Sequence, residues 1–217
     1  MKRNHNVLIV IAVSFLFGIA TFYSHCQTNI FYCKQLALIL SITNLNQFKF
    51  GYITQSDSHD EIYIHFELKC STYEDDIYDI ITVRNTVTEY LKKHPNNKLN
   101  EKKIEIVFYE GPGAELFIIR NFNYLQPSES LSGLNYYYLF SIPNLSSINM
   151  LYNAEGISVC TECIDNTEFL KEMDSLRYLE IRTDKMTDDI KSDIINSFEN
   201  CEVITDDKYS FELNVNE

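Results

Sequence analysis

Cys160 and Cys163 form the one motif in the chain with the spacing of a thiol–disulfide centre. Such a centre needs a thiol with a lowered pKa, which a nearby cation or a helix N-terminus provides. The nearest charged side chains are carboxylates such as Glu162, and negative charge disfavours a thiolate. We therefore expect a disulfide, either local or to Cys201, rather than a redox site. A thiol–disulfide protein stays as the alternative.

A short segment rich in histidine and acid offers a second candidate site. His59, Asp60, Glu61 and His65 are residue types that bind metals or transfer protons. On an extended strand, however, His65 shares its face with Tyr63, opposite a row of apolar residues. We expect a solvated histidine here and predict no metal site.

Motifs for other chemistries are absent from the sequence. We find no nucleophilic-serine, zinc-protease, phosphate-loop or dinucleotide motif. The acidic runs 74–76 and 188–189 lack the spacing of a calcium loop and fit helix starts. We expect no cofactor and no enzyme.

Three consecutive tyrosines, Tyr136, Tyr137 and Tyr138, form a strongly aromatic stretch with Phe140. Tyrosine is enriched at binding surfaces, and it is also common in buried strands. The three tyrosines are therefore a candidate binding surface, with a core strand as the alternative.

The composition describes a folded and acidic protein. Of its 217 residues, 45 % are hydrophobic and 23 % are charged, which excludes general disorder. The formal net charge is −13, so nucleic acid and anionic lipid are poor partners. We expect a protein partner and no nucleic acid.

The N-terminus has the layout of a secretory signal or a signal-anchor. Lys2 and Arg3 precede an uncharged apolar run over residues 7–23, and the next charged residue is Lys34. As a helix the run measures about 25 Å, close to the roughly 30 Å of a bilayer core. Residues 1–30 are predicted to be a signal peptide or a membrane anchor, and both remain open. If this segment is not cleaved, we expect it to make the membrane a partner. We expect the remainder of the chain to be extracytoplasmic, either anchored at the cell surface or secreted.

The number of cysteines suits an oxidising compartment. Six is an even number, and a chain of this size can bury a core without a disulfide framework. We expect one or two disulfides. The cysteines are Cys26, Cys33, Cys70, Cys160, Cys163 and Cys201.

Periodicity predicts a β-α-β-β unit over residues 61–125. Apolar residues alternate over 62–68, helical spacing follows from Thr72 to Lys93, and strand-like runs cover 103–109 and 115–122. Residues 31–60, which end in a polar break, are assigned to a membrane-proximal segment.

A spacing pattern repeats in the remaining unit, residues 126–217. Three sets share it: Leu145, Ile148, Met150 and Asn153; Leu176, Leu179, Ile181 and Asp184; and Phe198, Cys201, Val203 and Asp206. The pattern resembles the leucine-rich repeat, L-x-x-L-x-L-x-x-N, over about residues 142–206. The resemblance implies short strands in a stacked core and a sheet surface that binds proteins.

The predicted fold class is therefore α+β. A small β-α-β-β layer precedes a short leucine-rich-repeat-like α/β stack, behind an N-terminal hydrophobic signal or anchor helix. The expected function is a non-enzymatic extracytoplasmic interaction module. The alternatives are a thiol–disulfide protein that uses Cys160 and Cys163, and a purely structural cell-envelope protein.

Overall fold

The computed structural model describes residues 31–56, 58, 60–69, 76–111, 114–121, 133–198 and 200–206. The predicted signal or anchor over 1–30 lies outside the described residues, as do His59, Cys26, Cys70 and the predicted helix start at Thr72. Within the described ranges, no helix is long and apolar enough to cross a membrane.

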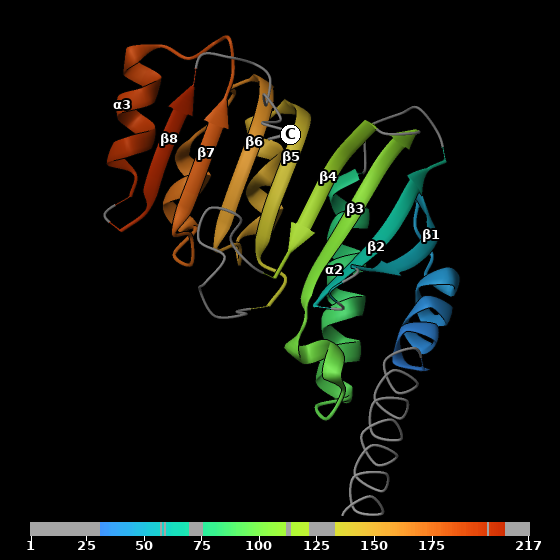
Figure 1. Ribbon diagram of the computed structural model, residues 1–217. Helices are drawn as coiled ribbons and strands as arrows, with labels where there is room; N and C mark the ends of the chain where they lie inside the picture. The colour runs from blue at the N-terminus through green and yellow to red at the C-terminus, as the bar shows by residue number, and fades with distance from the viewer. Residues whose placement is uncertain are drawn as a thin grey trace, which may run out of the picture.

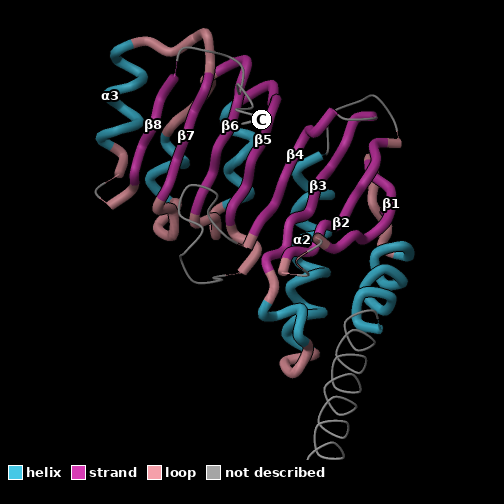
Figure 2. The backbone as a smooth tube through the Cα atoms, in the orientation of Figure 1, coloured by secondary structure: helices cyan, strands magenta, loops and turns pink. Residues whose placement is uncertain are grey.

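Eight strands form one mixed sheet in which the spatial order is the chain order (Figures 1 and 2). The parallel pairs are β2–β3, β5–β6, β6–β7 and β7–β8, and the other neighbours are antiparallel. The strands are β1 (Phe48–Gln55), β2 (Glu61–Leu68), β3 (Lys103–Gly111), β4 (Ala114–Arg120), β5 (Tyr136–Asn144), β6 (Gly156–Cys163), β7 (Tyr178–Arg182) and β8 (Glu202–Asp206).

Helical segments connect the strands and cover one face of the sheet. Residues 31–42 are helical, and the other segments are α2 (Asp76–Lys93), η1 (Lys98–Glu101), η2 (Leu145–Leu151), η3 (Glu168–Glu172) and α3 (Asp188–Asn196). The three η segments are 3₁₀ helices. The buried side chains of α2, η2, η3 and α3 join alternate strand residues in one hydrophobic cluster, so these helices share one side of the sheet.

The predicted β-α-β-β unit is confirmed in its elements and order. Ile62, Ile64 and Phe66 of β2 are buried, as the alternation predicts. Helix α2 ends on Lys92 and Lys93, where the helix dipole favours cations. The crossover through α2 makes β2 and β3 parallel neighbours.

The segment assigned to a membrane-proximal stretch contributes a helix and a strand to this core. Leu36 and Leu40, from the helix over 31–42, are each 1 % exposed, and Phe48 at the start of β1 is fully buried. The bulge at Gly51 disturbs the alternation of β1, which hid this strand in the sequence.

The first predicted repeat unit is misplaced. Leu145, Ile148 and Met150, expected on a strand, lie in η2, and the strand begins later, at Gly156. The second unit is placed on β7, where Leu179 and Ile181 are fully buried.

The sheet register defines different equivalent positions. Tyr137, Ile157, Leu179 and Val203 are neighbours on β5 to β8, so the intervals are 20, 22 and 24 residues. Cys201 of the third predicted unit therefore lies before β8, two residues ahead of the equivalent position. Strands β5 to β8 continue the sheet of the first half. The described residues show no separate leucine-rich-repeat solenoid.

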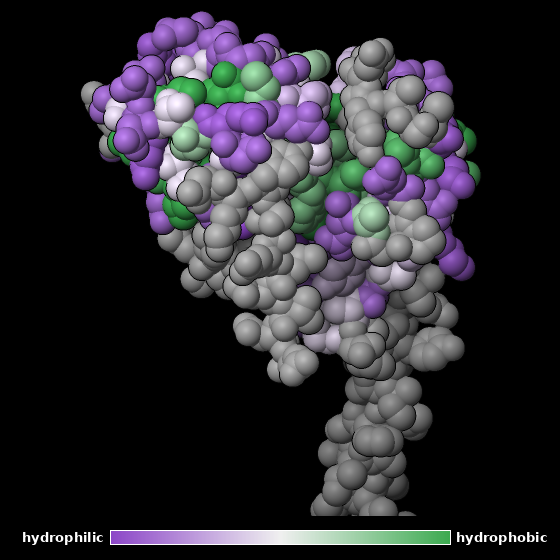
Figure 3. Space-filling model, turned by 90° about the horizontal axis from the view of Figure 1, so that it is seen from above, coloured by the Kyte–Doolittle hydropathy of each residue, from purple (hydrophilic) through white to green (hydrophobic). Residues whose placement is uncertain are grey.

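The second face of the sheet, opposite the helices, is rich in tyrosine, and we call it the tyrosine face. Its tyrosines are Tyr52, Tyr63, Tyr109, Tyr136, Tyr138 and Tyr178. Figure 3 shows the molecule from above relative to Figure 1. The described surface in this view is mainly hydrophilic, with smaller hydrophobic patches.

Candidate functional site

A stack of three aromatic rings crosses the first strands of the tyrosine face. The ring of Tyr52 on β1 lies 4.3 Å from that of His65 on β2, with 24° between the planes. The ring of His65 lies 5.7 Å from that of Tyr109 on β3, with 16° between the planes. Tyr63 is a further parallel neighbour of His65, at 6.4 Å. We call Tyr52, His65 and Tyr109 the ring stack.

The bulge in β1 sets the position of Tyr52. The register shifts between Phe50 and Tyr52, so that Phe50 stays paired with Phe66 while Tyr52 pairs with His65. Gly51 sits within the bulge, and a Cβ there would lie 3.1 Å from the carbonyl oxygen of His65. The close backbone approach favours glycine at this position.

The histidine of the ring stack is held neutral. Partial burial lowers the pKa of His65, so imidazole predominates near pH 7. Its Nε2 lies 3.0 Å from the hydroxyl of Thr54. Among the described residues Nδ1 has no hydrogen-bond partner. A neutral ring stacks on tyrosine without the desolvation cost of a charge.

The tyrosines around His65 are held in the protonated form. The hydroxyl of Tyr63 donates to Glu61 Oε2 at 2.5 Å, and this bond, with burial, raises the pKa of Tyr63 to about 12. Burial and the charge of Glu115 raise the pKa of Tyr109. These phenols therefore serve as hydrogen-bond donors rather than as bases or nucleophiles.

An ion pair occupies the middle of the face. Arg120 of β4 donates from Nε to the carboxylate of Glu105 on β3, and its guanidinium carbon lies 4.7 Å from the ring centroid of Tyr138 on β5. The side chains of Arg120 and Glu105 are only 13 % and 15 % exposed. This pair joins three strands through charge and cation–π contact.

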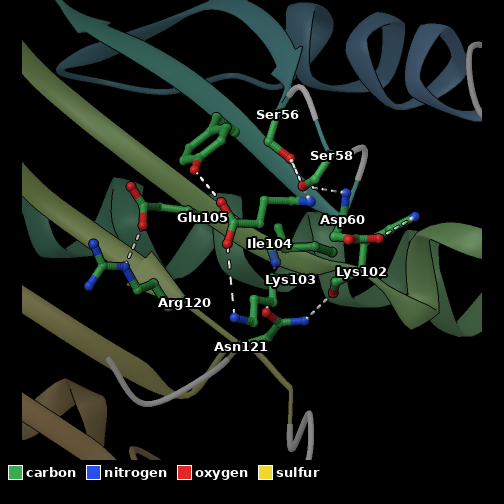
Figure 4. Close-up of polar contacts among 11 residues, drawn as sticks. Ser56, Ser58, Asp60, Lys102, Lys103, Ile104, Glu105, Arg120 and Asn121 are labelled. Atoms are coloured by element: carbon green, nitrogen blue, oxygen red, sulfur yellow. Dashed lines mark hydrogen bonds and ion pairs between the residues drawn. The ribbon is translucent and has the colours of Figure 1, made fainter. Parts of the chain in front are cut away.

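Further polar contacts link the chain segments next to the Arg120–Glu105 pair, as Figure 4 shows. The side-chain oxygen of Asn121 accepts from the backbone N–H of Ile104 at 2.7 Å, and its amide nitrogen donates to the carbonyl of Lys102 at 2.9 Å. The ammonium of Lys102 lies 3.7 Å from Asp60. Asp60 and Glu61, predicted as possible site residues, thus form ion pairs and hydrogen bonds within the sheet.

The half of the face over β6 and β7 is buried. Glu180, 9 % exposed, accepts hydrogen bonds from Ser158 and Tyr178 and pairs with Arg182 at 2.8 Å. Among the described tyrosines of the face, the most exposed is therefore Tyr52 on β1, at 52 %.

The strand geometry divides the predicted tyrosine surface. Tyr137 points into the helix-covered core and is 4 % exposed. Tyr136 is 7 % exposed, with its ring against Gly156. Tyr138 is partly exposed beneath Arg120. Of the three predicted residues, Tyr138 is the one with appreciable exposure.

The cysteine motif lies on a strand and not at a helix N-terminus. Cys160 is fully buried and Cys163 is exposed, and three residues along a strand place them on opposite faces of β6. In the structure Cys163 and Cys201 are not joined in a disulfide. Burial raises the pKa of Cys201 to about 11, with Glu202 adding to the shift and Arg177 opposing it.

A hollow adjoins the ring stack at the edge of the sheet. It has a volume of about 450 Å³ and lies between the helix over 31–42 and β1. Its lining includes Cys33, Ala37, Phe50 and Tyr52. Within the part of the chain that the structure describes, no three His, Cys, Asp or Glu side chains come close enough to hold a metal ion.

Sequence reasoning singled out His65 and missed the other two members of the ring stack. Tyr109 had a usable signal, because the alternation of its strand places it opposite the buried Phe108. Tyr52 had none, because the bulge interrupts the period of β1.

No protein-family model, no curated protein and no solved structure matches the chain.

Proposed function

We propose that the chain is a non-enzymatic, extracytoplasmic interaction module, membrane-anchored or secreted, that binds a protein partner through the tyrosine face. The ring stack of Tyr52, His65 and Tyr109 carries the proposal. Aligned rings on three strands, with more than half of Tyr52 exposed, offer a preformed contact surface. Tyrosine gives large contact area at low conformational-entropy cost, so it dominates many protein-binding surfaces.

Charged residues surround the ring stack in the manner of an interface rim. Lys49 and Glu67 form an exposed ion pair at 2.9 Å on β1 and β2. Lys103 and Glu61 form a partly exposed pair at 3.9 Å on β2 and β3. An aromatic centre with a polar rim is the usual anatomy of a protein-binding patch.

The chemistry of the face supports binding rather than proton transfer. The lowered pKa of His65 and the raised pKa values of Tyr63 and Tyr109 keep these side chains neutral near pH 7. They offer hydrogen bonds and ring contacts without an ionised nucleophile. The thiol–disulfide alternative gains less support, because Cys160 and Cys163 lie on opposite faces of β6.

Alanine variants of the ring stack test this proposal. The immobilised full chain is used to retain partners from a cell-surface extract, and the affinity of the retained protein is measured. Tyr52→Ala and Tyr109→Ala should each weaken binding by about tenfold, which corresponds to about 1.4 kcal/mol.

Two exposed tyrosines outside the face serve as matched controls. Tyr78 on α2 is 55 % exposed and Tyr152 after η2 is 63 % exposed. Tyr78→Ala and Tyr152→Ala should leave the affinity unchanged. Equal losses in all four variants, or no loss from the ring-stack variants, would contradict binding through the tyrosine face.

A further inference from the structure

We propose that the helix over residues 31–42 lies on the surface of a lipid bilayer, with Phe31, Leu38 and Ile42 inserted below the headgroups. The inference rests on the membrane-anchored form of the proposed function. It concerns a different surface from the tyrosine face. The two can therefore fail independently.

An apolar stripe runs along the outer side of this helix. Phe31, Leu38 and Ile42 are 55 %, 65 % and 76 % exposed. Their spacing of seven and four residues places them on one line of an α-helix, because 3.6 residues complete a turn. We call these three residues the outer stripe.

The opposite side of the helix is already used by the core. Leu36 and Leu40 are each 1 % exposed and pack in the hydrophobic cluster beneath the sheet. A helix on the surface of a water-soluble domain normally turns polar residues outward. The outer stripe departs from that pattern and calls for an apolar environment.

The distribution of charge points to a membrane as that environment. None of the 31 acidic residues precedes Asp57, and the charged residues before it are all basic: Lys2, Arg3, Lys34 and Lys49. All of the acidic residues therefore follow this helix in the sequence, and the segment next to the predicted anchor carries only positive charge. Lys34, exposed at the flank of the stripe, can reach the headgroups while its stem stays apolar.

Chain length keeps the helix close to the predicted anchor. The apolar run ends at residue 23, and residues 24–30 reach at most about 25 Å when fully extended. If residues 7–23 cross the bilayer, Phe31 is held within that distance of the membrane. A helix so placed, with an exposed apolar stripe, can lie along the interface with that stripe inserted.

A single-tryptophan reporter tests the insertion, because the chain contains no tryptophan. The full chain with Leu38→Trp is reconstituted into phosphatidylcholine vesicles with and without brominated acyl chains. We expect a blue-shifted emission in vesicles and a loss of intensity with the brominated lipid. Phe31→Trp provides a second reporter on the stripe. Tyr152→Trp, 63 % exposed beside η2, is the remote control and should show neither effect.

Paired carboxylate variants test the role of the stripe itself. In the Leu38→Trp background, Ile42→Asp places a charge on the stripe and should diminish the quenching. Ser41→Asp places the same charge on an exposed position about 100° around the helix and should retain it. Circular dichroism melting verifies that both variants are folded.

Three outcomes would overturn the proposal. In the first, the vesicles bind the chain but quench neither stripe reporter. In the second, both reporters are already shielded without vesicles, which would assign the stripe to another chain segment or to a second copy. In the third, the folded full chain does not bind the vesicles. Loss of partner binding in the Tyr52→Ala variant bears on the tyrosine face alone.

Discussion

The carboxylate of Asp79, on α2, accepts a hydrogen bond at 3.1 Å from the backbone N–H of Phe48, the first residue of β1. It also accepts hydrogen bonds from the backbone N–H groups of Asn46 and Gln47, at 2.9 and 2.7 Å. Asp79 is fully buried. A buried carboxylate is tolerated where several donors satisfy it, and here it fixes the entry of the chain into the sheet.

Replacing this carboxylate should destabilise the fold. Asp79→Asn exchanges an acceptor oxygen for an amide donor that faces backbone N–H groups, so we expect a loss of about 3 kcal/mol in the free energy of unfolding. Urea denaturation measures the loss. Asp193→Asn, at an exposed position of α3, is the control and should change little. Equal midpoints for the two variants would contradict the anchoring role of Asp79.

The contact between Tyr136 and Gly156 predicts a strong size constraint. A Cβ at Gly156 would lie 2.4 Å from a ring carbon of Tyr136. We expect Gly156→Ala to cost about 2 kcal/mol, since the ring is packed and must move. In a Tyr136→Ala background the same substitution should cost much less. A double-mutant cycle by urea denaturation measures the coupling, and purely additive effects would rule out the clash.

The lowered pKa of His65 predicts a dependence of stability on pH. Because burial lowers the folded-state pKa below the unfolded value of about 6.5, the unfolded chain binds the proton more readily. The stability contributed by neutral His65 is present above that value and is lost as pH falls through the folded-state pKa.

Substituting the ring without its nitrogens isolates this effect. His65→Phe keeps an aromatic ring in the stack and removes the titration. The unfolding free energy of the variant, measured between pH 7 and about pH 5, should fall less steeply than that of the wild type. Identical slopes would mean that His65 does not titrate differently in the two states.

The cysteines should differ in their rates of alkylation. In the reduced chain, exposed Cys163 should react with iodoacetamide faster than Cys201 and Cys160. Cys201 should react slowly at pH 8, because its pKa is raised to about 11. Cys160 should react only when the chain unfolds, because it is fully buried. Peptide mass mapping follows each site, and early modification of Cys160 would contradict the packing of β6.

The elements that were predictable from sequence are those with one buried side. The alternation of β2 and the helical period of α2 each reflect a single apolar face. By contrast, β6 has buried side chains on both faces from Ile157 to Thr161, so its sequence shows no period of two. Leu145, Ile148 and Met150 of the first predicted unit belong instead to a 3₁₀ helix, in which the spacing of three between Leu145 and Ile148 resembled the start of a repeat unit.

The candidate site was less predictable because it is formed by cross-strand neighbours. His65 and Tyr109 meet through the parallel register of β2 and β3, which follows from the long α2 crossover. The three consecutive tyrosines drew attention by composition, yet strand alternation turns Tyr137 into the core.

The agreement between strand order and chain order has a consequence for how the molecule acquires its shape. Each strand of the sheet hydrogen-bonds only to the strands that precede and follow it in the chain. No strand pairs with one that is distant in the sequence, and this keeps the entropic cost of loop closure low. The sheet can therefore grow one strand at a time, from β1 to β8, as the polypeptide emerges from a ribosome or a translocation pore.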